Sequence, residues 1–144
     1  MTPRYLAIDY GTKRIGLAVS SPIGTVHPRQ RLDRTEPDAD IRALVELARE
    51  EVAVALVMGL PHHMDGAQSE METQARAFAA KLAEASGLPI YGSDERLTSA
   101  EADRILKVQG QRNPRARKER IDSAAACILL QDFLGAEDNA ERIA

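Results

Sequence analysis

The sequence predicts an α/β fold in which a mixed central sheet carries helices on both faces. The chain has 144 residues, 44% of them hydrophobic, which is enough for one compact domain with a buried core. Two apolar runs, residues 6–8 and 52–58, lack polar alternation, as is typical of strands covered on both faces. Segments of helical periodicity separate the later strands, which indicates crossover connections between neighbours in one sheet.

The first three strands are expected to follow one another through tight turns. Residues 6–8 lead into Asp9, a glycine-led turn follows at Gly11, and a second apolar strand runs to Ser20. Residues 26–32 form a third, more polar strand, in which Pro28 favours an edge position because proline cannot donate to a ladder.

Helices and strands alternate from residue 35 onward. The first helix begins near residues 35–38, and a buried strand over 52–58 follows it. The second helix runs from Met71 to a C-terminal cap at Gly87, before a short strand over 88–91. A third helix is expected after residues 98–99, then a basic loop over 110–117 and a last helix over 118–133. We expect a single domain over residues 1–135 and a polar, fraying tail over 136–144.

Composition narrows the function classes. A formal net charge of -3 and a pI of about 5.6 argue against coating nucleic acid by bulk electrostatics, but they allow a local basic face. The single Cys127 excludes an intramolecular disulfide, and its place in an apolar helix predicts a core residue. Without a signal peptide or a long apolar segment, we expect a soluble, cytoplasmic protein that does not enter membranes.

Three carboxylates are the candidate site. Asp9 ends a buried strand, Glu95 follows another, and Asp122 lies within the apolar face of the last helix. Each has a structural alternative: Asp9 could cap its turn, Glu95 could be a solvated loop residue, and Asp122 could lie in the first turn of its helix, where the helix dipole favours anions. Because ligands bind beyond the carboxyl ends of strands in such sheets, the three together favour a functional site.

Clustered carboxylates favour divalent cations. Three of them within about 4 Å would repel one another by several kcal/mol per pair, so a cation is needed. An all-oxygen site favours Mg²⁺ or Mn²⁺ over Zn²⁺. Two such ions can activate a water and stabilise the leaving oxygen in phosphodiester cleavage. The acids therefore predict a divalent-metal site of a kind suited to phosphodiester cleavage.

The sequence resembles the YqgF/RuvX family, a bacterial RNase H-like group of Holliday junction resolvases and pre-16S rRNA nucleases. The resemblance covers nearly the whole chain and rests on residues 7–16 (AIDYGTKRIG), 59–61 (GLP) with 64–66 (MDG), 94–99 (DERLTS) and 121–126 (IDSAAA). It implies an RNase H-like fold, and the family's acidic triad falls on Asp9, Glu95 and Asp122. His62 and His63 stand where the family often has an apolar residue and Asn, and adjacent histidines are poorly placed to share a metal.

Basic residues are the candidate nucleic-acid contacts. Five cations immediately precede Asp122, namely Arg112, Arg115, Arg117, Lys118 and Arg120. They favour phosphate binding, and a solvated charged loop is the alternative. Lys118, one helical turn before Asp122, is the candidate for the reacting phosphate. Lys13, Arg14 and Arg96 could contact a nucleic-acid backbone or pair with nearby acids, and Thr98 and Ser99 could cap a helix or bind phosphate there.

The leading hypothesis is a metal-dependent endonuclease of branched DNA or structured RNA. A non-catalytic nucleic-acid-binding factor in ribosome maturation is the alternative. Residues 9–12 also resemble the phosphate loop of actin-like ATPases and sugar kinases, but those proteins close two such domains around ATP and this chain supplies one. Few aromatics favour recognition of backbone over bases. Junction resolution would require two active sites, so a homodimer is one expectation for the assembly.

Overall fold

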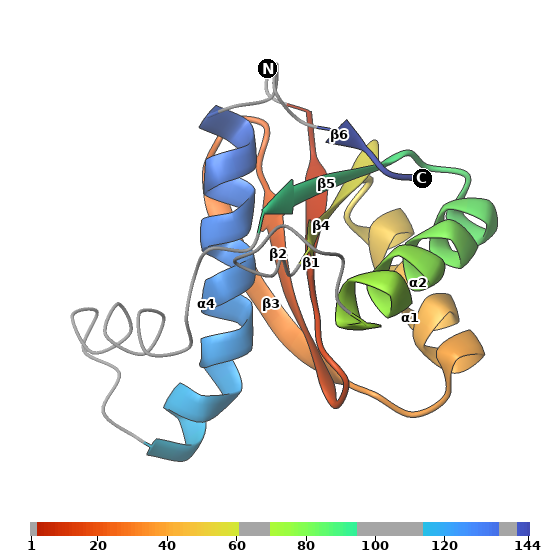
Figure 1. Ribbon diagram of the computed structural model, residues 1–144. Coiled ribbons are helices and arrows are strands. Elements are labelled where there is room, and N and C mark those ends of the chain that lie inside the picture. The colour runs from red at the N-terminus through yellow and green to blue at the C-terminus, as the bar shows by residue number, and fades with distance from the viewer. Residues whose placement is uncertain (1–2, 61–69, 95–113, 136–140) are drawn as a thin grey trace.

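The computed structural model describes residues 3–60, 70–94, 114–135 and 141–144, with side chains described except at 93–94 and 114–122. A six-stranded sheet forms its centre, in the order β3-β2-β1-β4-β5-β6 (Figure 1). The strands are β1 (Tyr5–Tyr10), β2 (Arg14–Ser20), β3 (Val26–Asp33), β4 (Ala55–Leu60), β5 (Ile90–Asp94) and β6 (Glu141–Arg142). β1, β4 and β5 are parallel, whereas β2, β3 and β6 pair antiparallel to their neighbours. The predicted mixed sheet is confirmed.

Helices cover both faces of the sheet, as predicted. Helices α1 (Pro37–Glu50) and α2 (Glu70–Ser86) lie on one face, and α4 (Pro114–Gly135) lies on the other (Figure 1). Alternation along β1 divides the core: Leu6 and Ile8 pack in the α1–α2 layer, and Ala7 packs in the α4 layer. Small side chains at Ala7 and Ala18 leave room for α4 to approach the sheet closely.

Three element boundaries differ from the sequence-based prediction. The short strand predicted over 88–91 is β5, Ile90–Asp94. The buried strand begins at Ala55, because the chain reverses after α1 through Val52, whose φ is 55° and whose side chain is 69% exposed. The last helix begins at Pro114, so residues 114–117 of the expected basic loop are helical. Proline is favoured at the first position of a helix because its fixed φ suits that position and its missing N–H is not needed there.

The C-terminal residues are bound to the sheet. β6 pairs with β5, the Ile143 N–H donates to the Ile90 carbonyl oxygen at 2.8 Å, and Ile143 packs against the α1–α2 layer. A Cβ at Gly92 would lie 2.8 Å from Ile143 Cγ2, so the glycine makes room for this strand. The prediction that the tail frays is therefore wrong for residues 141–144. The polar composition of the tail predicted fraying, but Ile143 packs against the core and residues 141–142 pair with β5, which the composition does not reveal.

In the part of the chain that the structure describes, no helix has the length and apolar character needed to cross a membrane.

Candidate metal and nucleic-acid site

Strands β1 and β5 end at the same edge of the sheet, and in the sequence each of these ends carries or directly precedes a candidate acid. Ile8 of β1 lies opposite Met58, which lies opposite Gly92, and Leu60 lies opposite Asp94 at the end of β5. With neighbouring strands about 4.8 Å apart, the ends of β1 and β5 are separated by roughly 10 Å across β4. Asp9 is half-buried at this carboxyl edge. Glu95 is the residue after Asp94 and lies outside the described residues.

The third acid belongs to α4, which crosses the sheet antiparallel to β1. The ring of Phe133 packs edge-on against Tyr5, at 5.1 Å between centroids, so the end of α4 lies beside the start of β1. Position 122, eleven residues earlier, is about 16 Å back along the helix. Asp9, four residues after Tyr5, is about 13 Å along its strand. The backbone therefore brings position 122 level with Asp9.

A buried hydroxyl fixes this part of α4 to the sheet. Ser123, 2% exposed, donates through Oγ to the Arg29 carbonyl oxygen of β3 at 2.6 Å. Arg29 lies opposite Leu17, which lies opposite Ile8, so this contact is one residue short of the level of Asp9. The side chain of Asp122 is not described, but the register of its helix is set by the neighbouring residue.

The structure places the predicted basic residues unevenly. Lys13 is exposed at the β1–β2 turn, and Arg14, half-buried, begins β2. The first two turns of α4 contain four of them, Arg115, Arg117, Lys118 and Arg120, of which only the backbone is described. Arg96, Thr98, Ser99 and Arg112 lie outside the described residues, as do His62 and His63. Among the described side chains, no three of His, Cys, Asp and Glu gather in a group that could hold a metal.

An ion pair that was not predicted from the sequence borders the turn after Asp9. Arg34 Nε donates to Asp40 Oδ2 at 3.2 Å, and the two side chains are 13% and 1% exposed. Arg34 Nη1 also donates to the Gly11 carbonyl oxygen in the turn after Asp9. Burial alone lowers the pKa of Arg34, but hydrogen bonds to Tyr10 and Asp40 outweigh it and raise the pKa above its ordinary value. The guanidinium stays charged.

A pattern in the sequence could have revealed this pair. Asp40 lies one helical turn before Leu44, which is buried, so its carboxylate interrupts the apolar row of α1. The same contradiction directed attention to Asp122.

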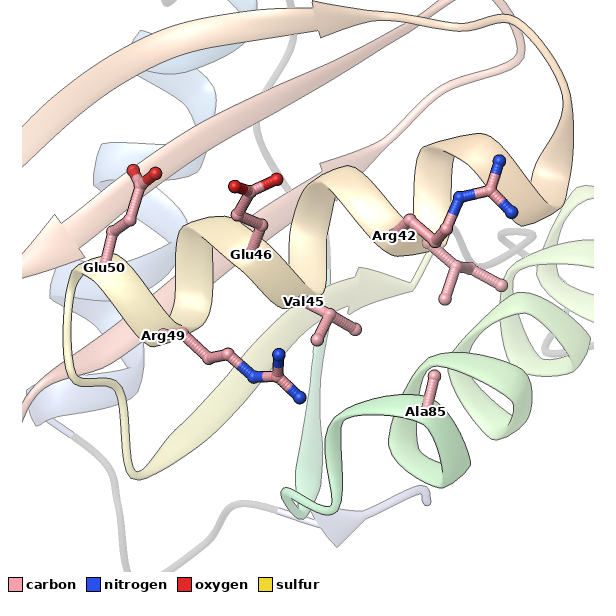
Figure 2. Close-up of a pocket in the computed structure, with 7 residues that line it drawn as sticks. Arg42, Val45, Glu46, Arg49, Glu50 and Ala85 are labelled. Atoms are coloured by element: carbon pink, nitrogen blue, oxygen red, sulfur yellow. The ribbon is translucent and has the colours of Figure 1, made fainter.

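Two other features lie apart from this site. A hollow of about 540 Å³ separates α1 from the end of α2, where Val45 and Ala85 face each other between charged side chains (Figure 2). It runs along α1 from Ile41 to Glu50 and reaches the last turn of α2 at Ala85, and Asp9 does not line it. Cys127 is half-buried in the α4 layer, and burial raises its pKa from 9.0 to about 11. A thiol with this pKa is a poor nucleophile at neutral pH, in agreement with a packing role.

Solved structures with this architecture define the class of fold. The structure of T. thermophilus RuvC in complex with Holliday junction substrate is similar over 98% of this chain and 99% of that chain, with a TM-score of 0.64 and 16% identity. The Fowlpox virus resolvase in complex with substrate Holliday junction DNA is similar over 93% and 98%, with a TM-score of 0.60 and 8% identity. The fold is that of the RNase H-like resolvases.

Sequence comparison gives the family within that class. The model of the family described as "RuvX: Holliday junction resolvase" matches residues 3–136, and the chain belongs to this family. A protein of Koribacter versatilis named "Putative pre-16S rRNA nuclease" is 41% identical over 132 residues, which cover 91% of this chain and 86% of that protein. One of the same name from Picosynechococcus is 42% identical over 130 residues, 90% of each chain. The chain is therefore an enzyme of the nuclease class.

Proposed function

We propose that this protein is a metal-dependent endonuclease that hydrolyses phosphodiester bonds in structured nucleic acid. Its substrates would be four-way DNA junctions, precursor 16S rRNA or both. One observation carries the proposal: β1 and β5 end at the same edge of the sheet, at Asp9 and at the residue before Glu95, and position 122 of α4 lies level with Asp9 along the strand direction.

The donor set fits a hard divalent cation. Asp9 is half-buried at the end of a strand, where a carboxylate needs a cation, hydrogen-bond donors or solvent. Asp9, Glu95 and Asp122 would hold Mg²⁺ or Mn²⁺, and two ions suit three carboxylates. When bound, such ions lower the pKa of a water and stabilise charge on the leaving oxygen. The oxygen-only donor set argues against a zinc site.

The basic residues would bind and orient the phosphate backbone. Lys118 precedes Asp122 by one helical turn, which favours contact with the reacting phosphate. Lys13 is exposed at the turn that follows Asp9, and the remaining candidates are Arg14, Arg96, Thr98, Ser99, Arg112, Arg115, Arg117 and Arg120. Contacts of this kind fix position on the backbone without reading sequence. Recognition of branched or folded shape then supplies the specificity.

Names of similar proteins support both substrate classes. The similar resolvases were solved with Holliday junction DNA, and the similar curated proteins are named for pre-16S rRNA. Junction resolution requires two opposed cuts, so a homodimer belongs to the DNA version of the proposal. Both substrates are found in the bacterial cytoplasm, and a single cysteine suits that reducing compartment. We therefore propose a cytoplasmic location.

Side-by-side cleavage assays test the proposal. The full chain would be incubated with a four-way DNA junction, single-stranded RNA and precursor 16S rRNA, with Mg²⁺, Mn²⁺ or EDTA. We expect metal-dependent cuts in a structured substrate, and the loss of at least about 100-fold in kcat for Asp9→Asn, Glu95→Gln and Asp122→Asn, because each removes a charged metal ligand. Tight binding without cleavage in every metal would favour a ribosome-maturation factor instead.

A further inference from the structure

The turn between β1 and β2 is held by one residue that lies outside the proposed metal and phosphate contacts. Arg34 directly follows β3, and its backbone N–H donates to the Lys13 carbonyl oxygen at 2.9 Å. Its Nη1 donates to the Gly11 carbonyl oxygen at 3.1 Å. Both carbonyl groups belong to the segment just after Asp9. Arg34 therefore fixes the path of the chain as it leaves the candidate acid.

Arg34 is itself fixed from a second element. Asp40 of α1 binds the guanidinium through Oδ2, and its Oδ1 accepts from the N–H and the hydroxyl of Thr35 at 3.1 Å and 3.3 Å. The carboxylate is 1% exposed. Because a buried charge pair with satisfied partners has little freedom to rearrange, α1 and the β1–β2 turn are rigidly linked.

Two aromatic rings complete the support. The Arg34 guanidinium carbon lies 4.8 Å from the centre of the Tyr10 ring and 5.3 Å from that of Phe78 on α2. The two rings contact each other at 5.1 Å. Tyr10 is the residue next to Asp9, so cation–π contact acts on the backbone that bears the carboxylate.

The turn has little room to relax. A Cβ at Gly11 would lie 2.5 Å from the Arg14 carbonyl oxygen, so the two backbone segments are already at close approach. We propose that Arg34 is a positioning residue of this site: by holding the Gly11–Lys13 turn against α1, it keeps Asp9 in the orientation in which its carboxylate binds a metal ion. This inference rests on the proposed function.

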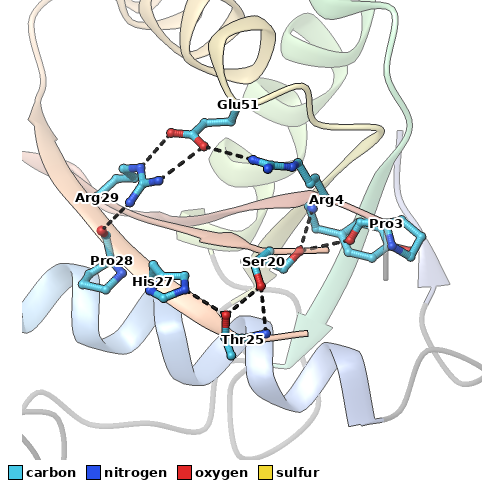
Figure 3. A network of polar contacts seen from close by, with 10 residues as sticks. Pro3, Arg4, Ser20, Thr25, His27, Pro28, Arg29 and Glu51 are labelled. Carbon is cyan, nitrogen blue, oxygen red and sulfur yellow. Dashed lines mark hydrogen bonds and ion pairs between the residues drawn. The ribbon is translucent and has the colours of Figure 1, made fainter. Parts of the chain in front are cut away.

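A second ion pair supplies a matched control. Arg29 Nε donates to Glu51 Oε1 at 2.7 Å, and Glu51 also lies 3.9 Å from Arg4, ahead of β1 (Figure 3). Glu51 is the C-terminal cap of α1 and begins the connection to β4. It therefore lies at the opposite end of α1 from Asp40, which holds Arg34. Loss of this pair should affect stability without affecting the turn after Asp9.

The test compares Arg34→Lys with Arg29→Lys in the full chain. Lysine keeps the charge but cannot reproduce the planar fork or its stacking. Four properties would be measured: the thermal midpoint, amide exchange of residues 10–14, Mn²⁺ binding by calorimetry, and kcat with Mg²⁺ on a four-way junction. Substrate affinity in EDTA would be measured alongside.

We expect both variants to lower the thermal midpoint, and only Arg34→Lys to affect the site. In that variant, exchange of residues 10–14 should accelerate, Mn²⁺ should bind more weakly, and kcat should fall about 10- to 100-fold, the usual effect of a misplacement near 1 Å. Affinity in EDTA should fall much less than kcat, because Lys13 and Arg14 are only two of the predicted phosphate contacts. If Arg34→Lys does not fold, Tyr10→Leu should give a smaller change in the same direction.

Parental exchange and kcat in Arg34→Lys would overturn the inference, as would equal losses in Arg29→Lys. A failure of the proposed function has a different signature. If the parent protein neither binds Mn²⁺ nor cuts any substrate, the nuclease proposal and this role for Arg34 both fail, even where exchange shows that Arg34 holds the turn.

Discussion

Two arginine–carboxylate pairs tie α1 to the sheet, with one carboxylate in the first turn of α1 and the other at its C-terminal cap, and the pairs differ in burial. Arg34 and Asp40 are 13% and 1% exposed, whereas Arg29 and Glu51 are 39% and 17% exposed. The buried pair borders the turn after Asp9, whereas in the more exposed pair the carboxylate of Glu51 lies near Arg4, ahead of β1. Water screens the more exposed pair and weakens its attraction. The stronger and more rigid of the two ion pairs is therefore the one next to the candidate site.

Replacing each carboxylate by its amide should give the largest difference between the two ends. Asp40→Asn leaves the Arg34 charge buried beside a neutral partner, and we expect it to lower the free energy of unfolding by about 3–5 kcal/mol. Glu51→Gln acts on a partly exposed pair and should cost about 1 kcal/mol or less. Urea denaturation of both variants measures the two values. Equal costs would show that burial does not distinguish the pairs.

A methyl group at Gly11 should give an intermediate effect. Gly11→Ala places Cβ 2.5 Å from a backbone oxygen, so the turn must move, at a cost of about 1–3 kcal/mol. Because that movement displaces the chain beside Asp9, cleavage should fall as well. Gly135→Ala at the end of α4 is the control, since no atom of the described residues lies within 4 Å of its added Cβ. Its unfolding free energy should stay within about 0.5 kcal/mol of the parent. A parental unfolding free energy in Gly11→Ala would show that the turn adapts freely.

The smallest effect is expected at Cys127, on the helix that covers both β1 and β3. Its pKa is raised from 9.0 to about 11, so the folded protein keeps the thiol proton that the unfolded chain releases. This contribution to stability is complete below pH 9 and is lost as the pH rises toward 11. Iodoacetamide should therefore react slowly at pH 9 and faster toward pH 11.

The reactivity of Cys127 also reports on the packing of α4 in the two carboxylate variants. Equal rates of labelling in the parent, Asp40→Asn and Glu51→Gln would show that neither substitution loosens α4. Rapid labelling of one variant at pH 8 would show that the disturbance spreads to α4.

Much of the fold could be predicted because hydrophobic periodicity acts locally. The unalternated run around Leu6 gave a buried strand, and Gly87, with a φ of 71°, ends α2 as a C-terminal cap should. The tail could not be predicted. Ile143 docks on β5 through backbone bonds and through space left at Gly92, and such complementarity between distant segments leaves no local pattern.

The candidate site also has a part that could be predicted from the sequence and a part that could not. Asp9 and position 122 could be named because a carboxylate interrupts an apolar pattern, and the fold brings their backbones level. The support behind Asp9 could not be named, since the bond from Arg34 to Gly11 joins residues 23 apart that share no periodicity. Which oxygens bind metal remains a prediction of the chemistry of the three acids.

Direct measurement of Mn²⁺ binding tests the central claim most closely. Calorimetry on the full chain would compare the parent with Asp9→Asn and Glu51→Gln, without nucleic acid. We predict that the parent and Glu51→Gln bind Mn²⁺ alike and that Asp9→Asn binds at least tenfold more weakly, because one charged ligand is gone. Equal affinity in Asp9→Asn and the parent would contradict a metal site at the carboxyl edge of β1.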